Sequence, residues 1–215
     1  MKKVVFWDVD TQYDFIMPDG KLCIPGAVDL LPRLARLTRT AQANHDRIQI
    51  IASMCDHEPS DAEISDQPNF RETFPPHCLR GSVGQMKVLS TEPAHPWIVT
   101  HEKLPALELQ RRLSSLGEEI VILKKMFDVF SNPNTEPIVQ HLDPEEIYLY
   151  GVALDVCDAH AIQGLLRLRR RNIYLVRDAT EAIDRARGNQ LVEQWSQRGV
   201  SLVNSDEVCR KFERA

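Results

Sequence analysis

Short apolar runs alternate with longer amphipathic segments along most of the chain. The short runs are rich in β-branched residues, which favours buried strands over helices. We expect six strands, over Val4–Val9, Arg47–Ser53, Ile120–Leu123, Ile147–Gly151, Ile173–Val176 and Val200–Val203. We expect helices where apolar residues recur at helical spacing, over Val28–Ala43, Leu104–Ser115, Thr135–His141, Asp155–Arg171, Gly188–Arg198 and Ser205–Glu213. This alternation predicts an α/β fold with a parallel sheet and helices on both faces.

One stretch, from Cys55 to Pro96, interrupts the alternation. It is rich in proline, glycine, histidine and acidic residues and shows little periodicity. Loops longer than about 15 residues are uncommon in compact domains unless they are functional. Ligands of open α/β sheets bind beyond the carboxyl ends of the strands. Because this stretch follows the second predicted strand, we expect it to lie over a binding site.

The composition suits a single domain over residues 1–215, since 215 residues can bury one large core. A net charge of −5, with both signs interspersed, argues against nucleic-acid and membrane partners. The five cysteines are scattered and form no CxxC pair, which is typical of a reduced protein. No segment reads as a signal peptide or a bilayer-spanning run. We therefore expect a cytoplasmic protein.

A candidate nucleophile follows the fourth predicted strand. The sequence Tyr150–Cys157 reads as a strand, a tight turn and the first turn of a helix, with Asp155 as the expected N-cap. A cysteine at a helix start has its thiolate favoured by the unpaired backbone N–H groups. The alternative is a small buried cysteine without chemistry.

Two further strand ends carry charged residues that could serve this thiol. Asp10 follows the first predicted strand and Lys124 follows the third. Together with Cys157 they suit acyl transfer, in which the acid takes the thiol proton and the lysine stabilises negative charge. The backbone N–H groups of Leu154 and Cys157 are placed to hold an oxyanion. The alternatives are that Asp10 caps a loop and that Lys124 reaches solvent.

Four segments of the chain carry sequence motifs in a fixed order. They are Asp10–Phe15, Phe74–Gly84, Lys124–Phe130 and Gly151–Cys157. They resemble, in order, the D-x-Q-x-D-F opening of the isochorismatase-like cysteine hydrolases, the W-P-x-H-C-x-x-G-T-x-G segment of their nicotinamidase branch, K-x-x-[YF]-[SD]-x-F and the nucleophile turn G-V-x-x-[DN]-x-C. The resemblance covers nearly the whole chain.

This resemblance implies a three-layer sandwich with a six-stranded parallel sheet and helices on both faces. It assigns the family's catalytic triad to Asp10, Lys124 and Cys157. It also implies a cis peptide bond at Ala153–Leu154 and a homo-oligomer, either a dimer or a tetramer.

Nicotinamidases hold a divalent metal beside the nucleophile, and the resemblance places its ligands at His57, Glu63 and His77. Cys55 stands where the family has an aspartate, and Cys55 or Asp56 could complete the set. Two histidines and a carboxylate are competent for zinc or a similar cation. The alternative is a metal-free loop whose polar groups bond to each other. We expect no organic cofactor. The remaining histidines lack a matching arrangement: His45, His95, His101, His141 and His160.

The function that this resemblance implies is hydrolysis of a small carboxamide through a cysteine thioester, as in nicotinamidase, which converts nicotinamide to nicotinate and ammonia. Phe15 and Phe74 would sandwich a flat ring. Three further residues are expected to contact the substrate: Phe127, Ala153 and Leu154. Two residues depart from the family pattern, in which a threonine precedes Asp155 and an apolar residue commonly follows the nucleophile. Leu154 makes that substrate contact apolar. The charge of Asp158 suits the helix dipole on the first turn but should oppose thiolate formation at Cys157, and the sequence does not decide between these effects.

Other functions stay open at this point. The substrate could be a ureido, carbamoyl or other amide, and the stretch between His57 and His77 would set that choice. The chain could instead be a binding protein that has lost activity. Isochorismate hydrolysis is less expected, because that chemistry needs no thiol. A redox-sensing thiol is a weaker variant, since no resolving cysteine is close to Cys157 in the sequence.

Overall fold

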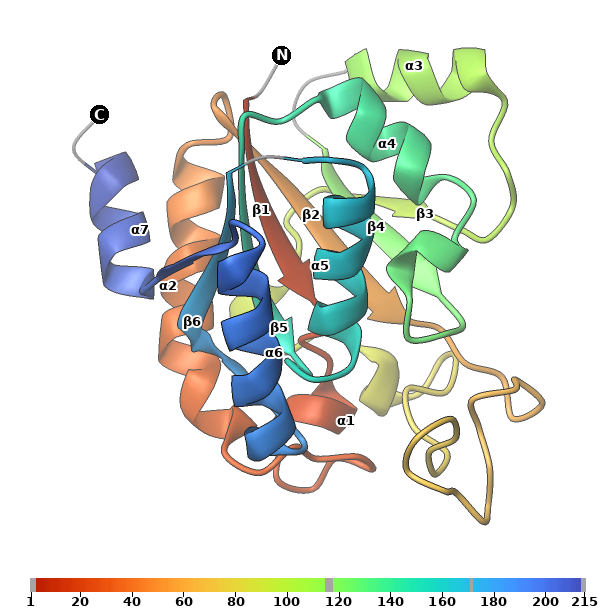
Figure 1. The fold of residues 1–215 in the computed structure, drawn as a ribbon. Helices are drawn as coiled ribbons and strands as arrows, with labels where there is room; N and C mark the ends of the chain where they lie inside the picture. Colours follow the sequence, from red (N-terminus) through yellow and green to blue (C-terminus); the bar gives the residue numbers. More distant parts are fainter. Residues whose placement is uncertain (1–2, 115–117, 171, 214–215) are drawn as a thin grey trace.

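Seven parallel strands form one sheet in the computed structural model, which describes residues 3–114, 118–170 and 172–213 (Figure 1). Their order across the sheet is β3-β4-β2-β1-β5-β6-β7. The strands are β1 (Val4–Val9), β2 (Ile48–Cys55), β3 (Pro96–Val99), β4 (Glu119–Lys124), β5 (Glu146–Val152), β6 (Ile173–Glu181) and β7 (Ser201–Val203). All six predicted strands are present, and β3 is an additional one.

The prediction of a six-stranded sheet is therefore wrong by one strand. β3 has four residues, begins at a proline and pairs with β4 alone, at the edge of the sheet. An edge strand tolerates proline because the missing N–H faces away from the ladder. Only Trp97 and Val99 are buried in it. So short a run, next to an irregular stretch, carries no clear strand pattern.

Helices cover both faces of the sheet, as predicted (Figure 1). They are α1 (Tyr13–Ile16), α2 (Leu31–Ala43), α3 (Ala106–Ser114), α4 (Thr135–Leu142), α5 (Cys157–Arg167), α6 (Arg185–Gln197) and α7 (Ser205–Glu213), with 3₁₀ turns at Ala27–Leu30, Val83–Gln85, Leu89–Thr91 and Val129–Ser131. Two residues in predicted helices, Ser115 and Arg171, lie outside the described residues. No helix in the described part of the chain is long and apolar enough to cross a membrane.

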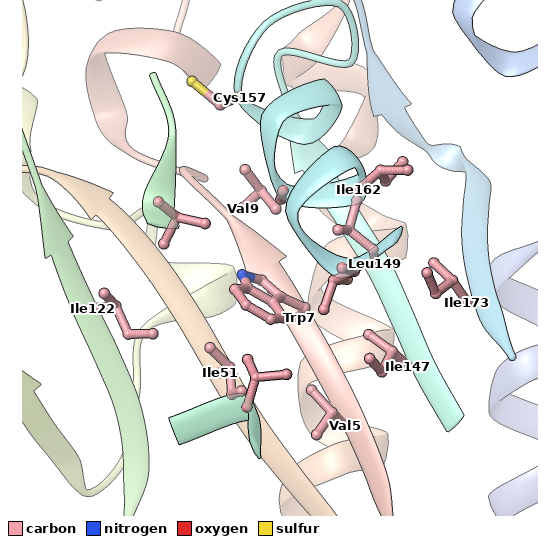
Figure 2. Packing of buried hydrophobic residues seen from close by; sticks show 14 of the residues in the cluster. Val5, Trp7, Val9, Ile51, Ile122, Ile147, Leu149, Cys157, Ile162 and Ile173 are labelled. Atoms are coloured by element: carbon pink, nitrogen blue, oxygen red, sulfur yellow. The ribbon is translucent and has the colours of Figure 1, made fainter. Parts of the chain in front are cut away.

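Two hydrophobic cores lie on opposite faces of the sheet. The first packs alternate residues of β1 against α4, α5 and α6, and Figure 2 shows Trp7 at its centre. The second packs Phe6 against α1, α2 and α7. Side chains alternate between the faces of a strand, so one short strand serves both cores.

The register of the central strands brings their carboxyl ends together. Val9 of β1 pairs with Ser53 of β2 and Gly151 of β5, and Cys55 of β2 pairs with Lys124 of β4. The residues that end these strands therefore meet at one edge of the sheet, where the candidate chemistry is expected.

Replacing Gly151 with alanine should destabilise this junction strongly. Gly151 has φ +128°, which side chains rarely adopt, and a Cβ there would clash with the Val9 carbonyl oxygen. Gly199 has φ +91° but open space around it. We expect Gly199→Ala to cost about 1 kcal/mol of unfolding free energy from the backbone conformation alone. Gly151→Ala should cost about 3 kcal/mol of unfolding free energy, because overpacking against the Val9 carbonyl adds to the cost of the backbone conformation. Urea unfolding measures both, and equal costs would contradict the clash.

Candidate active site

A buried ammonium at the end of β4 is the centre of the site. The Lys124 side chain is fully buried, and its Nζ lies 2.8 Å from Asp10 Oδ2. The same nitrogen lies 3.0 Å from Cys55 Sγ and 3.5 Å from Cys157 Sγ, and it donates to the Met126 carbonyl oxygen at 3.2 Å. Lys124 thus points inward and does not reach solvent. The structure brings the three predicted triad residues together and adds Cys55 as a fourth.

Charge pairing keeps Lys124 protonated. Burial works to lower the pKa of Lys124, but the negative charge of Asp10 and the neighbouring thiols outweigh it and hold that pKa well above its usual value. Asp10 follows β1 with φ +49° and accepts a hydrogen bond from Ser53 Oγ at 2.8 Å. Its carboxylate contacts Lys124 and Ser53, so it is part of the buried site and does not merely cap a loop.

Cys157 is the first residue of α5 and is 7% exposed. A hydrogen bond with Cys55, together with burial, raises the pKa of the Cys157 thiol well above its usual value, while Lys124 works to lower it. The resting side chain is therefore a thiol, and a base must take its proton before the sulfur can act as a nucleophile. Lys124 is placed to stabilise the thiolate that this transfer produces.

The start of α5 differs from the sequence prediction in two ways. Its N-cap is Val156, not Asp155, and no side chain caps the helix there. The Asp155 carboxylate instead accepts hydrogen bonds from the backbone N–H groups of Ile183 and Asp184, at 2.9 and 3.0 Å. Asp155 thus joins the turn before α5 to the loop before α6. The cis peptide bond is Val152–Ala153, one bond earlier than expected.

One of the two predicted oxyanion donors is already engaged. The Leu154 N–H donates to the Glu181 carbonyl oxygen at 2.8 Å, so it is not free for a substrate. The Leu154 side chain is fully buried in the first core, where it packs toward α6. The N–H groups of Ala153 and Cys157 donate to no backbone acceptor among the described residues. Ala153 therefore replaces Leu154 as the available donor beside the thiol.

Asp158 is neutral at the base of the site. It is fully buried, and neither carboxyl oxygen has a hydrogen-bond partner in the described part of the protein. Burial, followed by the nearby charges of Asp10 and Asp155, raises its pKa well above its usual value. A protonated Asp158 carries no charge, so it does not oppose thiolate formation at Cys157 as the sequence suggested.

A second cluster of buried polar groups lies beside the thiols. Glu63 Oε1 is 3.6 Å from both His57 Nε2 and His77 Nε2. One donor atom each of Cys55, His57 and His77 lies within 4.8 Å of the others. All four side chains are at most 2% exposed. The long loop between β2 and β3 supplies three of them, so it does lie over the site.

The cluster fits a divalent metal. Both ring nitrogens of His57 and Oε2 of Glu63 are buried without a hydrogen-bond partner in the structure as described. Burial lowers the pKa of His77 to about 4, so the ring is neutral, and its Nδ1 pairs with the Pro75 carbonyl oxygen at 2.8 Å. That bond leaves Nε2 as a free lone pair facing Glu63. Donor separations of 3.6 Å suit a tetrahedral zinc ion, whose ligand atoms are about 3.4 Å apart.

Asp56, which the sequence offered as an additional metal ligand, forms hydrogen bonds with other side chains. Its carboxylate accepts two hydrogen bonds from Arg80, at 2.9 and 2.6 Å, and one from Gln85 at 2.6 Å. Arg80 pairs with Glu58 as well. Cys55 is therefore the residue that can act as a further metal ligand beside the two histidines and Glu63.

A narrow apolar cavity opens onto Cys157. Its lining residues are Phe15, Leu22, Ile24, Glu63, Phe74, His77, Phe127, Ala153, Val156, Cys157 and Ile183. Four predicted contacts are among them, namely Phe15, Phe74, Phe127 and Ala153, whereas Leu154 is not. The cavity volume is about 20 Å³, which is room for about one water molecule. Leu22, Ile24, Val156 and Ile183 were missed, because isolated apolar residues in turns show no periodicity.

Comparisons with known proteins agree with this architecture. A family model described as the Isochorismatase domain matches residues 5–207. No curated protein sequence matches the chain. Pyrazinamidase of Pyrococcus horikoshii, solved in complex with zinc, is 20% identical, with a TM-score of 0.71 over 94% of this chain and 99% of that one.

Two other solved structures have similar folds. Pyrazinamidase/nicotinamidase from Streptococcus mutans is 18% identical, with a TM-score of 0.71 over 93% of this chain and 99% of that one. N-carbamoylsarcosine amidase from Thermoplasma acidophilum is 20% identical, with a TM-score of 0.69 over 96% of this chain and 98% of that one. At these identities, the likeness shows a shared fold and leaves the substrate open.

The buried Asp158 predicts a pH-dependent difference in stability. Because its pKa is raised in the folded state, the unfolded chain loses this proton first as pH rises above about 4, and the folded state loses stability. Asp158→Asn removes this loss. In urea unfolding from pH 4 to 8, the unfolding free energy of the variant should rise relative to that of the wild type by up to about 1.4 kcal/mol per pH unit. An Asp66→Asn control on the exposed loop should show a constant difference. A constant difference for Asp158→Asn would contradict a neutral Asp158.

Proposed function

Because this chain belongs to the isochorismatase family, we propose that it is a hydrolase that cleaves a small carboxamide through a thioester at Cys157. Its activity is most similar to that of a nicotinamidase, which converts nicotinamide to nicotinate and ammonia. The observation that carries this proposal is the buried Lys124 ammonium, which contacts both Asp10 and the Cys157 sulfur. This arrangement supplies a base and a charge partner beside a nucleophile that lines the cavity.

The proposed reaction begins with transfer of the Cys157 proton toward Asp10. The thiolate, held by Lys124, attacks the carboxamide carbon and forms a tetrahedral intermediate. The N–H groups of Ala153 and Cys157 face the oxyanion that develops. The C–N bond breaks, and ammonia leaves with the proton that Asp10 had accepted. Water then attacks the thioester, which releases the acid and restores the thiol.

The cavity lining supports a neutral, flat substrate. Its only polar side chains are Glu63, His77 and Cys157, and no cationic side chain is among its lining residues. A carboxylate in this cavity would lose its hydration without gaining a cationic side chain as a partner. A neutral ring amide can instead pack against the aromatic rings of Phe15 and Phe74, which line the cavity. Anionic substrates, such as N-carbamoyl amino acids and isochorismate, are therefore disfavoured. Because the cavity holds about one water molecule, its walls must move apart when substrate enters.

His57, Glu63 and His77, with Cys55 beside them, would hold a divalent cation such as zinc. The bound cation would supply a Lewis acid that positions a ring nitrogen or a water beside the thiol. The unpartnered nitrogens of His57 and the free lone pair of His77 support this assignment. A metal-free site would leave these buried polar atoms unsatisfied.

The other expectations from the sequence stay predictions. They are a cytoplasmic location, a dimer or tetramer, and the absence of nucleic-acid and membrane partners. A small-molecule amide is the partner that the cavity supports.

Replacing Cys157 with alanine should abolish ammonia release, because the step that forms the thioester loses its nucleophile. The panel contains nicotinamide, pyrazinamide and an N-carbamoyl amino acid, and ammonia is measured for each. We expect release from the two ring amides, little from the anionic compound, and a loss of about 1,000-fold or more in the variant. A Cys209→Ala variant, buried at the far helix α7, should keep wild-type rates. Inactivity of the wild type on all amides would contradict the proposal.

Metal content gives a separate test of the His57 cluster. Protein purified without chelator should bind about one zinc ion per chain, as structural and catalytic zinc sites do. His57→Ala should bind none, since it removes a ligand whose buried ring nitrogens make no hydrogen bond in the described part of the chain. A His45→Ala variant on the surface should bind like the wild type. Equal zinc uptake by the two variants, measured by elemental analysis, would place the metal elsewhere.

A further inference from the structure

Two buried thiols meet at the same ammonium. Cys55 Sγ lies 3.0 Å from Lys124 Nζ, and Cys157 Sγ lies 3.5 Å from it. Their shared contact with one nitrogen atom holds the two sulfurs close to each other. Cys55 ends β2 and Cys157 begins α5, so the fold brings together two cysteines that are far apart in the sequence. The reaction proposed above uses only one of them as a nucleophile.

We propose that Cys55 and Cys157 are a redox pair that closes to a reversible disulfide when a small hydroperoxide oxidises Cys157. Cys55 is the resolving cysteine that the sequence did not reveal. The pair is a modification site, and the hydroperoxide is its oxidant.

The chemistry balances in two steps. Cys157 first gives its proton toward Asp10, and its sulfur then attacks one oxygen of hydrogen peroxide; the O–O bond breaks, and the departing hydroxide takes that proton to become water. Cys157 is then a sulfenic acid. Cys55 Sγ attacks the sulfenic sulfur, the S–O bond breaks, and the leaving hydroxide takes the Cys55 proton. Overall, two thiols and one peroxide give one disulfide and two waters.

The positions of the two sulfurs set the order of these steps. Cys157 lines the cavity, whereas Cys55 is fully buried behind it. A cavity of about 20 Å³ admits molecules near the size of water, so a small peroxide reaches Cys157 first. Cys55 is held beside the sulfur that becomes electrophilic, because both sulfurs contact Lys124 Nζ. Condensation therefore competes well with further oxidation to the irreversible sulfinic acid.

The other cysteines are less suited to this role. Cys78 is buried nearby, and its backbone N–H donates to Asp14 at 2.7 Å, but its thiol has no hydrogen bond to Cys157 or Lys124 among the described contacts. Cys23 is exposed. Cys209 lies in α7 and packs in the second core. Only Cys55 shares the ammonium with the nucleophile.

Peptide mapping after peroxide treatment tests the pair directly. The folded protein is treated with hydrogen peroxide, quenched in acid, alkylated while unfolded and digested with trypsin. Cleavage after basic residues puts Cys55, Cys78 and Cys157 on separate peptides, Ile48–Arg71, Glu72–Arg80 and Met126–Arg167. We expect the first and third to be joined, with the loss of two hydrogens, and to separate after dithiothreitol.

Two variants serve as controls. In Cys55→Ser, Cys157 should proceed to the sulfinic acid and should not be recovered by dithiothreitol. Cys78→Ser should form the disulfide as the wild type does. The inference is overturned if wild-type Cys157 reaches the sulfinic acid as fast as in Cys55→Ser, or if its peptide is joined to that of Cys78. The main readout is a wild-type peptide mass, so it needs neither a folded variant nor a substrate. An inactive protein that forms the disulfide would refute the proposed hydrolase and leave the redox pair standing.

Discussion

The site depends on the contacts that the buried Lys124 ammonium makes with its partners. An unpaired buried charge costs several kcal/mol, so a lysine at this depth is stable only with partners around it. Asp10 supplies the opposite charge, while the Met126 carbonyl and two thiols accept the remaining contacts. These partners come from the ends of β1 and β2, the turn after β4 and the first residue of α5. The requirement to satisfy one cation therefore fixes several elements around the nucleophile.

Two further titratable groups of the site carry no charge. His77 is uncharged because burial lowers its pKa to about 4, and burial keeps Asp158 protonated. The cavity beyond Cys157 is apolar except for Glu63 and His77. In the proposed reaction, the Asp10–Lys124 pair meets the charge that develops on the Cys157 sulfur. The apolar lining of the cavity supports the proposal of a neutral amide substrate.

The sequence predicted six of the seven strands and the proximity of Asp10, Lys124 and Cys157, because both rest on local signals. Strand runs were apolar and β-branched, and the triad residues follow strand ends that parallel pairing brings together. The failures have non-local causes. β3 is a short edge strand that begins with proline. The Leu154 N–H donates a hydrogen bond to the Glu181 carbonyl oxygen, and the Asp155 carboxylate accepts hydrogen bonds from the loop before α6. In both cases the partner is distant in sequence. Cys55 and Cys157 reach the same Lys124 nitrogen only when β2 and α5 pack around it.

The central claim is that Lys124 and Asp10 make Cys157 an acyl-forming nucleophile. Rapid mixing with nicotinamide, followed by acid quenching and peptide mass analysis, tests it most directly. The account predicts a transient nicotinoyl group on the Met126–Arg167 peptide, formed no later than ammonia and absent in Lys124→Met. Ammonia release at full rate while this peptide stays unmodified at every time point would contradict it.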